Sequence, residues 1–214
     1  MRWTEQSPAL PLQSVDALAD RAPPLAALLA TTADGLLVGV AAAAGEAILQ
    51  HLADHAEERG GLLLGEVYAS DGTVAGSRVV HVTQAVAAED CFGTGVSLRM
   101  SSAVWDAARR RLRPQEMIVG WYHSHPDLGA FFSRTDRQTQ RAFFAHAYSV
   151  GWVVDPLRRE SQWFVGADCV APAQVRYGLV DGACAAGGTG VAGATGGAAP
   201  IHGGAPTIST LWTK

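Results

Sequence analysis

Cysteine is scarce in this sequence, and its few positions exclude two common kinds of stabilising site. The 214 residues contain only Cys91, Cys169 and Cys184, and no two of them form a C-x-x-C pair. A disulfide framework needs paired cysteines, and a structural zinc site usually needs a cluster of them. The pattern instead fits a reducing compartment, so we expect a cytoplasmic location.

Long apolar runs and an excess of positive charge are also lacking. The apolar tract 23–45 is interrupted by Asp34 and falls short of the roughly 20 residues that a membrane helix needs. The net charge is −4 and the isoelectric point about 5.9. The arginine cluster at 109–113 is typical of a solvated helix end. We therefore expect neither a membrane nor a nucleic-acid partner.

Charged residues are missing altogether from 182–213, a segment dominated by glycine and alanine. Such sequence buries too little apolar surface to offset the entropy lost on ordering. The first 34 residues carry four prolines between short apolar runs, and they predict an extension with at most one helix, near 14–22. The chain is thus expected to divide into an N-terminal extension (1–34), a folded domain (35–181) and a Gly/Ala-rich flexible tail (182–214).

Within the folded domain, apolar periodicity predicts alternating strands and helices. The composition is that of a globular protein, with 48% apolar and 17% charged residues. The order of elements predicts an α/β protein of the α+β type, with a mixed β-sheet flanked by helices. Strands are expected at 36–40, 62–68, 77–86, 117–122, 150–155, 162–166 and 175–180, and helices at 46–57, between 101 and 113, and at 135–147.

Three potential metal ligands stand close together after the expected strand 117–122. His123 and His125 are two residues apart at a strand end, so their side chains point to the same side. Asp136 follows in the first turn of the next expected helix, where the helix dipole favours a carboxylate. Two imidazoles and one carboxylate leave a fourth zinc position for water, which is typical of catalytic zinc. The alternative is a polar turn that happens to contain two histidines.

Two further residues are candidates to complete a hydrolytic site. A zinc-bound water needs a general base, and Glu58, at the expected junction of helix and strand, is the best candidate. Its neighbour Glu57 must be distinguished from it, and a carboxylate at a helix end can also simply face water. Ser133 is a candidate to donate a hydrogen bond from its hydroxyl to a developing oxyanion, although a serine there is also a plain helix N-cap.

Together these positions resemble the JAMM (MPN+) motif of zinc metallopeptidases. Glu58-x-x-Gly61, His123-Ser124-His125-Pro126, Ser133 and Asp136 match that motif in residue type and spacing. The flanking segments 61–65 and 119–126 are similar to those of the proteasome-lid deubiquitinases. The resemblance covers about 37–180, and it implies the MPN, cytidine-deaminase-like fold and makes 35–181 a catalytic domain.

The resemblance also implies a role for each residue. His123, His125 and Asp136 would bind one Zn²⁺, with Glu58 as the base and Ser133 stabilising the oxyanion. The loop matching 90–98 would pair with the extended tail of a substrate as an added strand. The candidate substrate contacts are Phe92, Gly93 and Trp121, the last of which is alternatively a wall of the metal pocket.

The implied activity is cleavage after the C-terminal tail of a ubiquitin-like modifier, in deconjugation or precursor maturation. The partners would be the modifier, its conjugates, and the activating and conjugating enzymes of a bacterial pathway. Two alternatives stay open: processing of a sulfur-carrier protein or its amino-acid adduct, and a non-catalytic scaffold. Scaffold members of the family lack the histidines or the acid. A zinc deaminase is excluded, because its H-x-E and P-C-x-x-C signature is absent.

Overall fold

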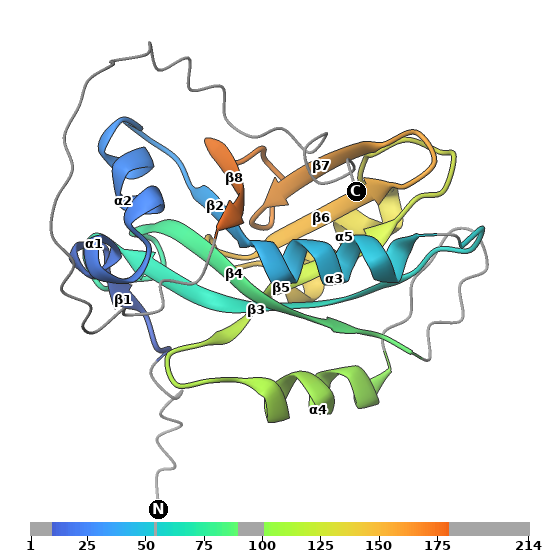
Figure 1. The fold of residues 1–214 in the computed structure, drawn as a ribbon, viewed down its shortest axis with the longest axis horizontal. Coiled ribbons are helices and arrows are strands. Elements are labelled where there is room, and N and C mark those ends of the chain that lie inside the picture. The colour runs from blue at the N-terminus through green and yellow to red at the C-terminus, as the bar shows by residue number, and fades with distance from the viewer. Residues whose placement is uncertain (1–9, 54, 90–100, 180–214) are drawn as a thin grey trace, which may run out of the picture.

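The computed structural model describes residues 10–53, 55–89 and 101–179 as a mixed sheet with helices on both faces (Figure 1). This architecture confirms the α+β class predicted from the order of elements. The strands are β1 (Gln13–Ser14), β2 (Leu37–Ala41), β3 (Gly60–Ala69), β4 (Ser77–Ala87), β5 (Met117–Ser124), β6 (Val150–Asp155), β7 (Glu160–Val165) and β8 (Gln174–Leu179). The helices are α1 (Leu18–Arg21), α2 (Pro23–Ala30), α3 (Ala42–Leu52), α4 (Ser102–Arg111) and α5 (Arg134–Phe143), with a 3₁₀ turn at Val15–Ala17.

The order of strands brings distant parts of the sequence to one edge of the sheet. Across the sheet the order is β7-β6-β5-β3-β4-β2-β8, and β1 pairs with β3. Strand β5 is antiparallel to β3 and parallel to β6, so the end of β5 lies beside the start of β3. Gly60 is the register partner of His123. The segment just before β3, which carries Glu58, therefore meets the two histidines.

Alternation along the strands divides the core between the two faces of the sheet. On β3, Leu63 packs in the same cluster as Ile48 of α3, whereas Leu62 and Leu64 pack in a second cluster with Val104 of α4. Successive strand residues point to opposite faces, so one sheet separates these two cores. Figure 1 shows α3 on one side of the strands and α4 on the other. None of the described helices has the length and apolar character needed to cross a bilayer.

The described part of the N-terminal extension packs on the sheet. Leu18 of α1 and Leu25 of α2 are fully buried in a third cluster with Tyr68 and Val79. The prediction of at most one helix in this region is wrong, because α1 and α2 are separate short helices. The chain turns at Ala22, where the backbone leaves the helical region before the prolines that begin α2. The proposed division at 34 and 181 stays a prediction, and 180–214 lie outside the described residues.

Two helices end earlier than the sequence predicts. Helix α3 stops at Leu52 rather than at residue 57, since Leu52 is the last residue of its buried stripe. Glu58 consequently lies in the connection to β3 and not on a helix. Helix α5 stops at Phe143 rather than at residue 147. The Gln140 side-chain amide donates to the carbonyls of Phe144 and Ser149, which holds the chain in a turn after the helix.

Candidate metal centre

The three predicted ligands come together at the end of β5 and the start of α5. His123 and His125 lie on and just after β5, and Asp136 lies in the first turn of α5. All three residues are buried. Among the described residues they are the one group of His, Cys, Asp or Glu whose ligand atoms converge, lying within 4.8 Å of one another.

The ligand atoms form a compact triangle. The Nε2 atoms of His123 and His125 are 3.1 Å apart. Asp136 places Oδ1 3.4 Å from His123 Nε2 and Oδ2 3.5 Å from His125 Nε2. Ligands arranged tetrahedrally at about 2.0–2.1 Å from a zinc ion lie about 3.3 Å apart. The spacing and the donor types therefore both fit one zinc ion.

The electrostatics of the triangle also favour a cation. Burial lowers the pKa of His123 despite the nearby Asp136, so its ring is neutral at pH 7. Burial lowers the pKa of His125 too, but the Asp136 and Glu58 carboxylates outweigh it and raise that pKa above the ordinary value. Burial alone would raise the pKa of Asp136, yet its contacts with the two imidazoles hold it well below the usual range. A carboxylate ionised beside buried imidazoles creates a site for positive charge.

Glu58 faces this triangle, and Glu57 does not. Glu58 is buried with Oε1 3.7 Å from His125 Nε2, while Glu57 is exposed. Burial raises the pKa of the Glu58 carboxyl, His125 lowers it, and Asp136 raises it further. The chain here is fixed by Arg59, whose backbone N–H donates to Ser124 Oγ at 3.0 Å and whose carbonyl accepts from Ser124 N at 2.8 Å.

A close backbone approach explains the glycine of the same motif. A Cβ added to Gly61 would lie 2.1 Å from the carbonyl oxygen of Val86 on the neighbouring strand. A side chain at position 61 would therefore push β3 and β4 apart next to Glu58. The glycine keeps the strand that follows Glu58 in register with the sheet.

Ser133 is the N-cap of α5 and forms a capping box with Asp136. Its hydroxyl accepts from Asp136 N at 3.2 Å, and its own N–H donates to Asp136 Oδ2 at 2.7 Å. The N-cap reading of Ser133 is therefore confirmed. The same bonds orient the Asp136 carboxylate toward the histidines.

Trp121 lies behind the ligands. It is 1% exposed, its ring stacks on His123 with centroids 4.5 Å apart, and its Nε1–H donates to Gln140 Oε1 at 2.7 Å. This placement favours the wall of the metal pocket over direct contact with a substrate. The other two predicted contacts, Phe92 and Gly93, lie outside the described residues.

Sequence reasoning missed two residues that support the site. Gln140, on α5, links the wall residue Trp121 to the turn after the helix. Asp155, the last residue of β6, accepts backbone hydrogen bonds from the loop that follows His125. An acidic residue at the end of an otherwise apolar strand is a weak signal for Asp155, and no pattern marks Gln140.

Comparison with known proteins supports the family resemblance that the motif indicates. The pattern of the family described as prokaryotic homologs of the JAB domain matches residues 41–165. The chain is 39% identical over 103 residues to the 26S proteasome non-ATPase regulatory subunit 14 of Drosophila melanogaster. It is 37% identical over 103 residues to the ubiquitin carboxyl-terminal hydrolase RPN11 of Saccharomyces cerevisiae. Each match covers 46% of this chain and 31% of the relative.

A solved structure supports the fold. The solution structure of a protein from Desulfitobacterium hafniense aligns with a TM-score of 0.54 at 17% identity. The alignment covers 68% of this chain and 95% of that chain. At this identity the likeness concerns the fold alone.

Proposed function

Because this chain belongs to the family of prokaryotic homologs of the JAB domain, we propose that it is a zinc-dependent JAMM-type peptidase. Its substrate would be the C-terminal tail of a ubiquitin-like protein, cut from a target or from a precursor. The names of two relatives, a ubiquitin hydrolase and a proteasome subunit, support this substrate class. These relatives share only part of their length with this chain, so substrate and partners belong to the proposal.

One observation carries the proposal: three ligand atoms lie within 4.8 Å of one another, and a second buried acid, Glu58, faces them. A structural zinc site is closed by four protein ligands, whereas a catalytic site keeps a position free. Here His123, His125 and Asp136 supply three, and Glu58 Oε1 lies 3.7 Å from one of them. Glu58 thus lies beside the ligand set, where a base must be to reach a water bound there.

The chemistry follows from what each residue can do. Zinc held in such a site supplies Lewis acidity, which lowers the pKa of water toward about 7. Glu58 accepts a proton from the attacking water and returns it to the leaving amine. The C–N bond breaks, a C–O bond forms, and the products are a carboxylate and an amine. The Ser133 hydroxyl donates a hydrogen bond to the carbonyl oxygen as negative charge develops there.

The remaining residues keep this geometry fixed. The Trp121 ring lies flat against His123 and excludes water from that side of the imidazole. The capping box sets the direction of the Asp136 carboxylate. A non-catalytic scaffold has no need of this set, so the intact ligands, base and serine favour an enzyme. Processing of a sulfur-carrier protein would use the same chemistry on a different tail.

The test compares two neighbouring glutamates. Glu58→Gln keeps the size of the buried side chain but cannot accept the proton, so cleavage of a ubiquitin-like fusion should fall about 10²–10⁴-fold. Zinc content, measured by elemental analysis, should stay at the wild-type level. Glu57→Gln changes the exposed neighbour and should leave the rate unchanged.

The outcomes separate the roles. Full turnover by Glu58→Gln would refute the base assignment. Equal loss in both variants would point to a general effect of charge near the substrate rather than to proton transfer. Wild-type protein that retains no zinc, or that cuts equally well with a chelator present, would refute the metallopeptidase itself.

A further inference from the structure

Asp155, at the end of β6, is a buried carboxylate that binds four backbone N–H groups. Its residue exposure is 0%. Oδ1 accepts from the N–H groups of Asp127, Leu157 and Arg158 at 3.0–3.1 Å, and Oδ2 accepts from Gly129 N at 2.7 Å. A buried charge is tolerated only when hydrogen bonds replace its hydration. Asp155 thus joins the loop after His125 to the turn between β6 and β7.

The loop that Asp155 holds has an unfavourable backbone of its own. Asp127 has φ +60° and Gly129 has φ +90°, both in the left-handed region. A non-glycine residue in that region costs free energy and persists only when its surroundings impose it. The hydrogen bonds that Asp127 and Gly129 donate to Asp155 supply such a constraint. Arg158 adds a second tie by donating to the Asp127 carbonyl at 2.7 Å.

This loop connects two parts of the metal centre. It leaves His125, whose own N–H donates to Val154 O at 2.9 Å, and it leads to Ser133, the N-cap of the helix that carries Asp136. The Leu128 N–H donates back to the carbonyl of His125 at 3.2 Å. Residues 126–132 therefore form the direct chain connection between His125 and the helix that carries Asp136.

We propose that Asp155 is a positioning residue that fixes this loop and thereby keeps His125 and Asp136 within reach of one zinc ion. The inference rests on the proposed zinc site, and it adds a residue that is neither a ligand nor a catalytic group. Backbone hydrogen bonds from the loop and the turn hold the pKa of Asp155 below its ordinary value although burial opposes this. The carboxylate is accordingly ionised when it binds the loop.

A second buried carboxylate provides the matched control. Glu116 precedes β5, at the opposite end of that strand from His123, and its side chain is 2% exposed. It also accepts several hydrogen bonds: Thr83 Oγ1 at 2.6 Å, Gln84 Nε2 at 2.8 Å and Arg113 N at 2.8 Å. Loss of either carboxylate should lower stability, but only Asp155 contacts the loop of the metal centre.

The experiment measures zinc affinity by competition with a chromophoric chelator, beside thermal unfolding of the zinc-free proteins. Asp155→Ala should weaken zinc binding about 10–100-fold, as expected for loss of an outer-shell support. Asp155→Asn keeps one carbonyl oxygen as acceptor, so its zinc affinity should lie between those of Asp155→Ala and the wild type. Glu116→Gln should change zinc affinity by no more than about twofold, because distant sites act independently.

Each result has a definite meaning. A graded loss of affinity confined to the Asp155 variants supports the positioning role. If Asp155→Asn and Glu116→Gln bind zinc equally well after comparable losses of stability, Asp155 is only a structural carboxylate and the inference is wrong. This reading holds even if Asp155→Ala does not fold. Absence of zinc binding by the wild type would instead refute the proposed function.

Discussion

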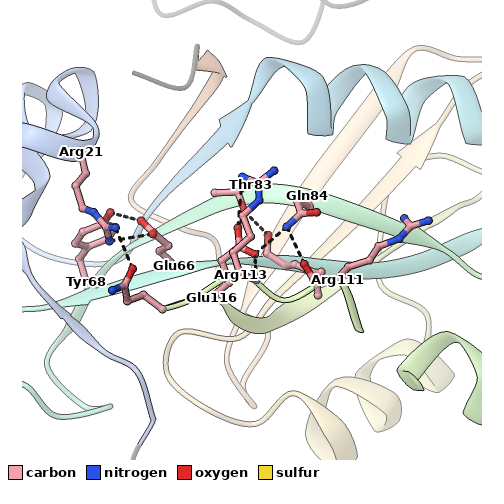
Figure 2. A network of polar contacts seen from close by, with 10 residues as sticks. Arg21, Glu66, Tyr68, Thr83, Gln84, Arg111, Arg113 and Glu116 are labelled. Atoms are coloured by element: carbon pink, nitrogen blue, oxygen red, sulfur yellow. Dashed lines mark hydrogen bonds and ion pairs between the residues drawn. The ribbon is translucent and has the colours of Figure 1, made fainter. Parts of the chain in front are cut away.

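Acidic side chains are buried at both ends of strand β5, but the groups that surround their carboxylates differ between the two ends. At the far end, which we define by Glu66 and Glu116, protein donors meet the carboxylates. Figure 2 shows Glu116 among Thr83, Gln84 and Arg113, and Glu66 between Arg21 and Tyr68. Every one of these bonds joins a donor to an acceptor within the chain.

At the metal end, defined by Glu58, His123, His125 and Asp136, the polar atoms face one another instead. The two Nε2 atoms are 3.1 Å apart, and both lie within 3.5 Å of the Asp136 carboxylate. A neutral imidazole has one N–H, and the carboxylates of Asp136 and Glu58 have none, so this cluster offers more acceptors than donors. A cation bound by His123, His125 and Asp136 would satisfy these three acceptors at once. A buried acid alone therefore does not indicate a metal site, whereas several acceptors that converge on one point do.

The largest expected effect is the stabilisation of the metal end by zinc. A ligand that binds only the folded state raises the free energy of unfolding by about 4 kcal/mol at a free concentration 1,000 times its Kd. Thermal unfolding with buffered zinc should therefore show a large rise in Tm for the wild type. His123→Ala removes one ligand and should abolish most of that rise.

The control for this prediction lies at the far end. Glu116→Gln should show the same zinc-dependent rise in Tm as the wild type, from a lower starting value. A rise of equal size in His123→Ala would contradict the difference drawn between the two ends, because the zinc would then bind elsewhere.

An intermediate effect is expected from Glu116→Gln without metal. The amide places N–H groups where Thr83, Gln84 or Arg113 now donates, so at least one buried donor loses its acceptor. Leaving such a group unsatisfied costs about 1–3 kcal/mol. Urea unfolding of the zinc-free protein measures this loss. No loss of stability would mean that the far end is not held by its hydrogen bonds.

The smallest effect is expected from Arg21→Ala. Arg21 Nη1 lies 3.0 Å from Glu66 Oε1, but the arginine side chain is 38% exposed, so solvent screens the pair. Partly exposed ion pairs contribute about 0–1 kcal/mol. The same urea titration should therefore detect at most a small shift, with zinc affinity unchanged. If Arg21→Ala lost more stability than Glu116→Gln, the exposed ion pair of Glu66 would matter more to the far end than the buried hydrogen bonds of Glu116.

The metal end was predicted from the sequence because its information is local. Strand periodicity places His123 and His125 on one side, and Ser133 and Asp136 share the first turn of α5. The structure brings the two pairs together. The general fold followed from the apolar periodicity of β3–β6, whose buried runs are long. Glu58 came from its motif, and the structure distinguishes it from Glu57 by burial.

The supporting residues were not predictable in the same way. Asp155 and Glu116 each bind partners 26–33 residues away in the sequence. The distant partners of Asp155 are backbone N–H groups, which any residue except proline offers. The end of α3 was misplaced because the alanines after Leu52 continue a helical pattern, although Leu52 is the last buried residue of the helix. Propensity does not reveal where tertiary packing stops.

The most direct measurement is zinc-edge X-ray absorption spectroscopy of the zinc-loaded protein, with the zinc content determined on the same sample. We expect one zinc per chain with nitrogen and oxygen neighbours at about 2.0–2.1 Å, including the multiple-scattering pattern of two imidazoles, which His125→Ala should reduce to one. A sulfur neighbour at about 2.3 Å, or a spectrum unchanged in His125→Ala, would contradict the proposed ligand set.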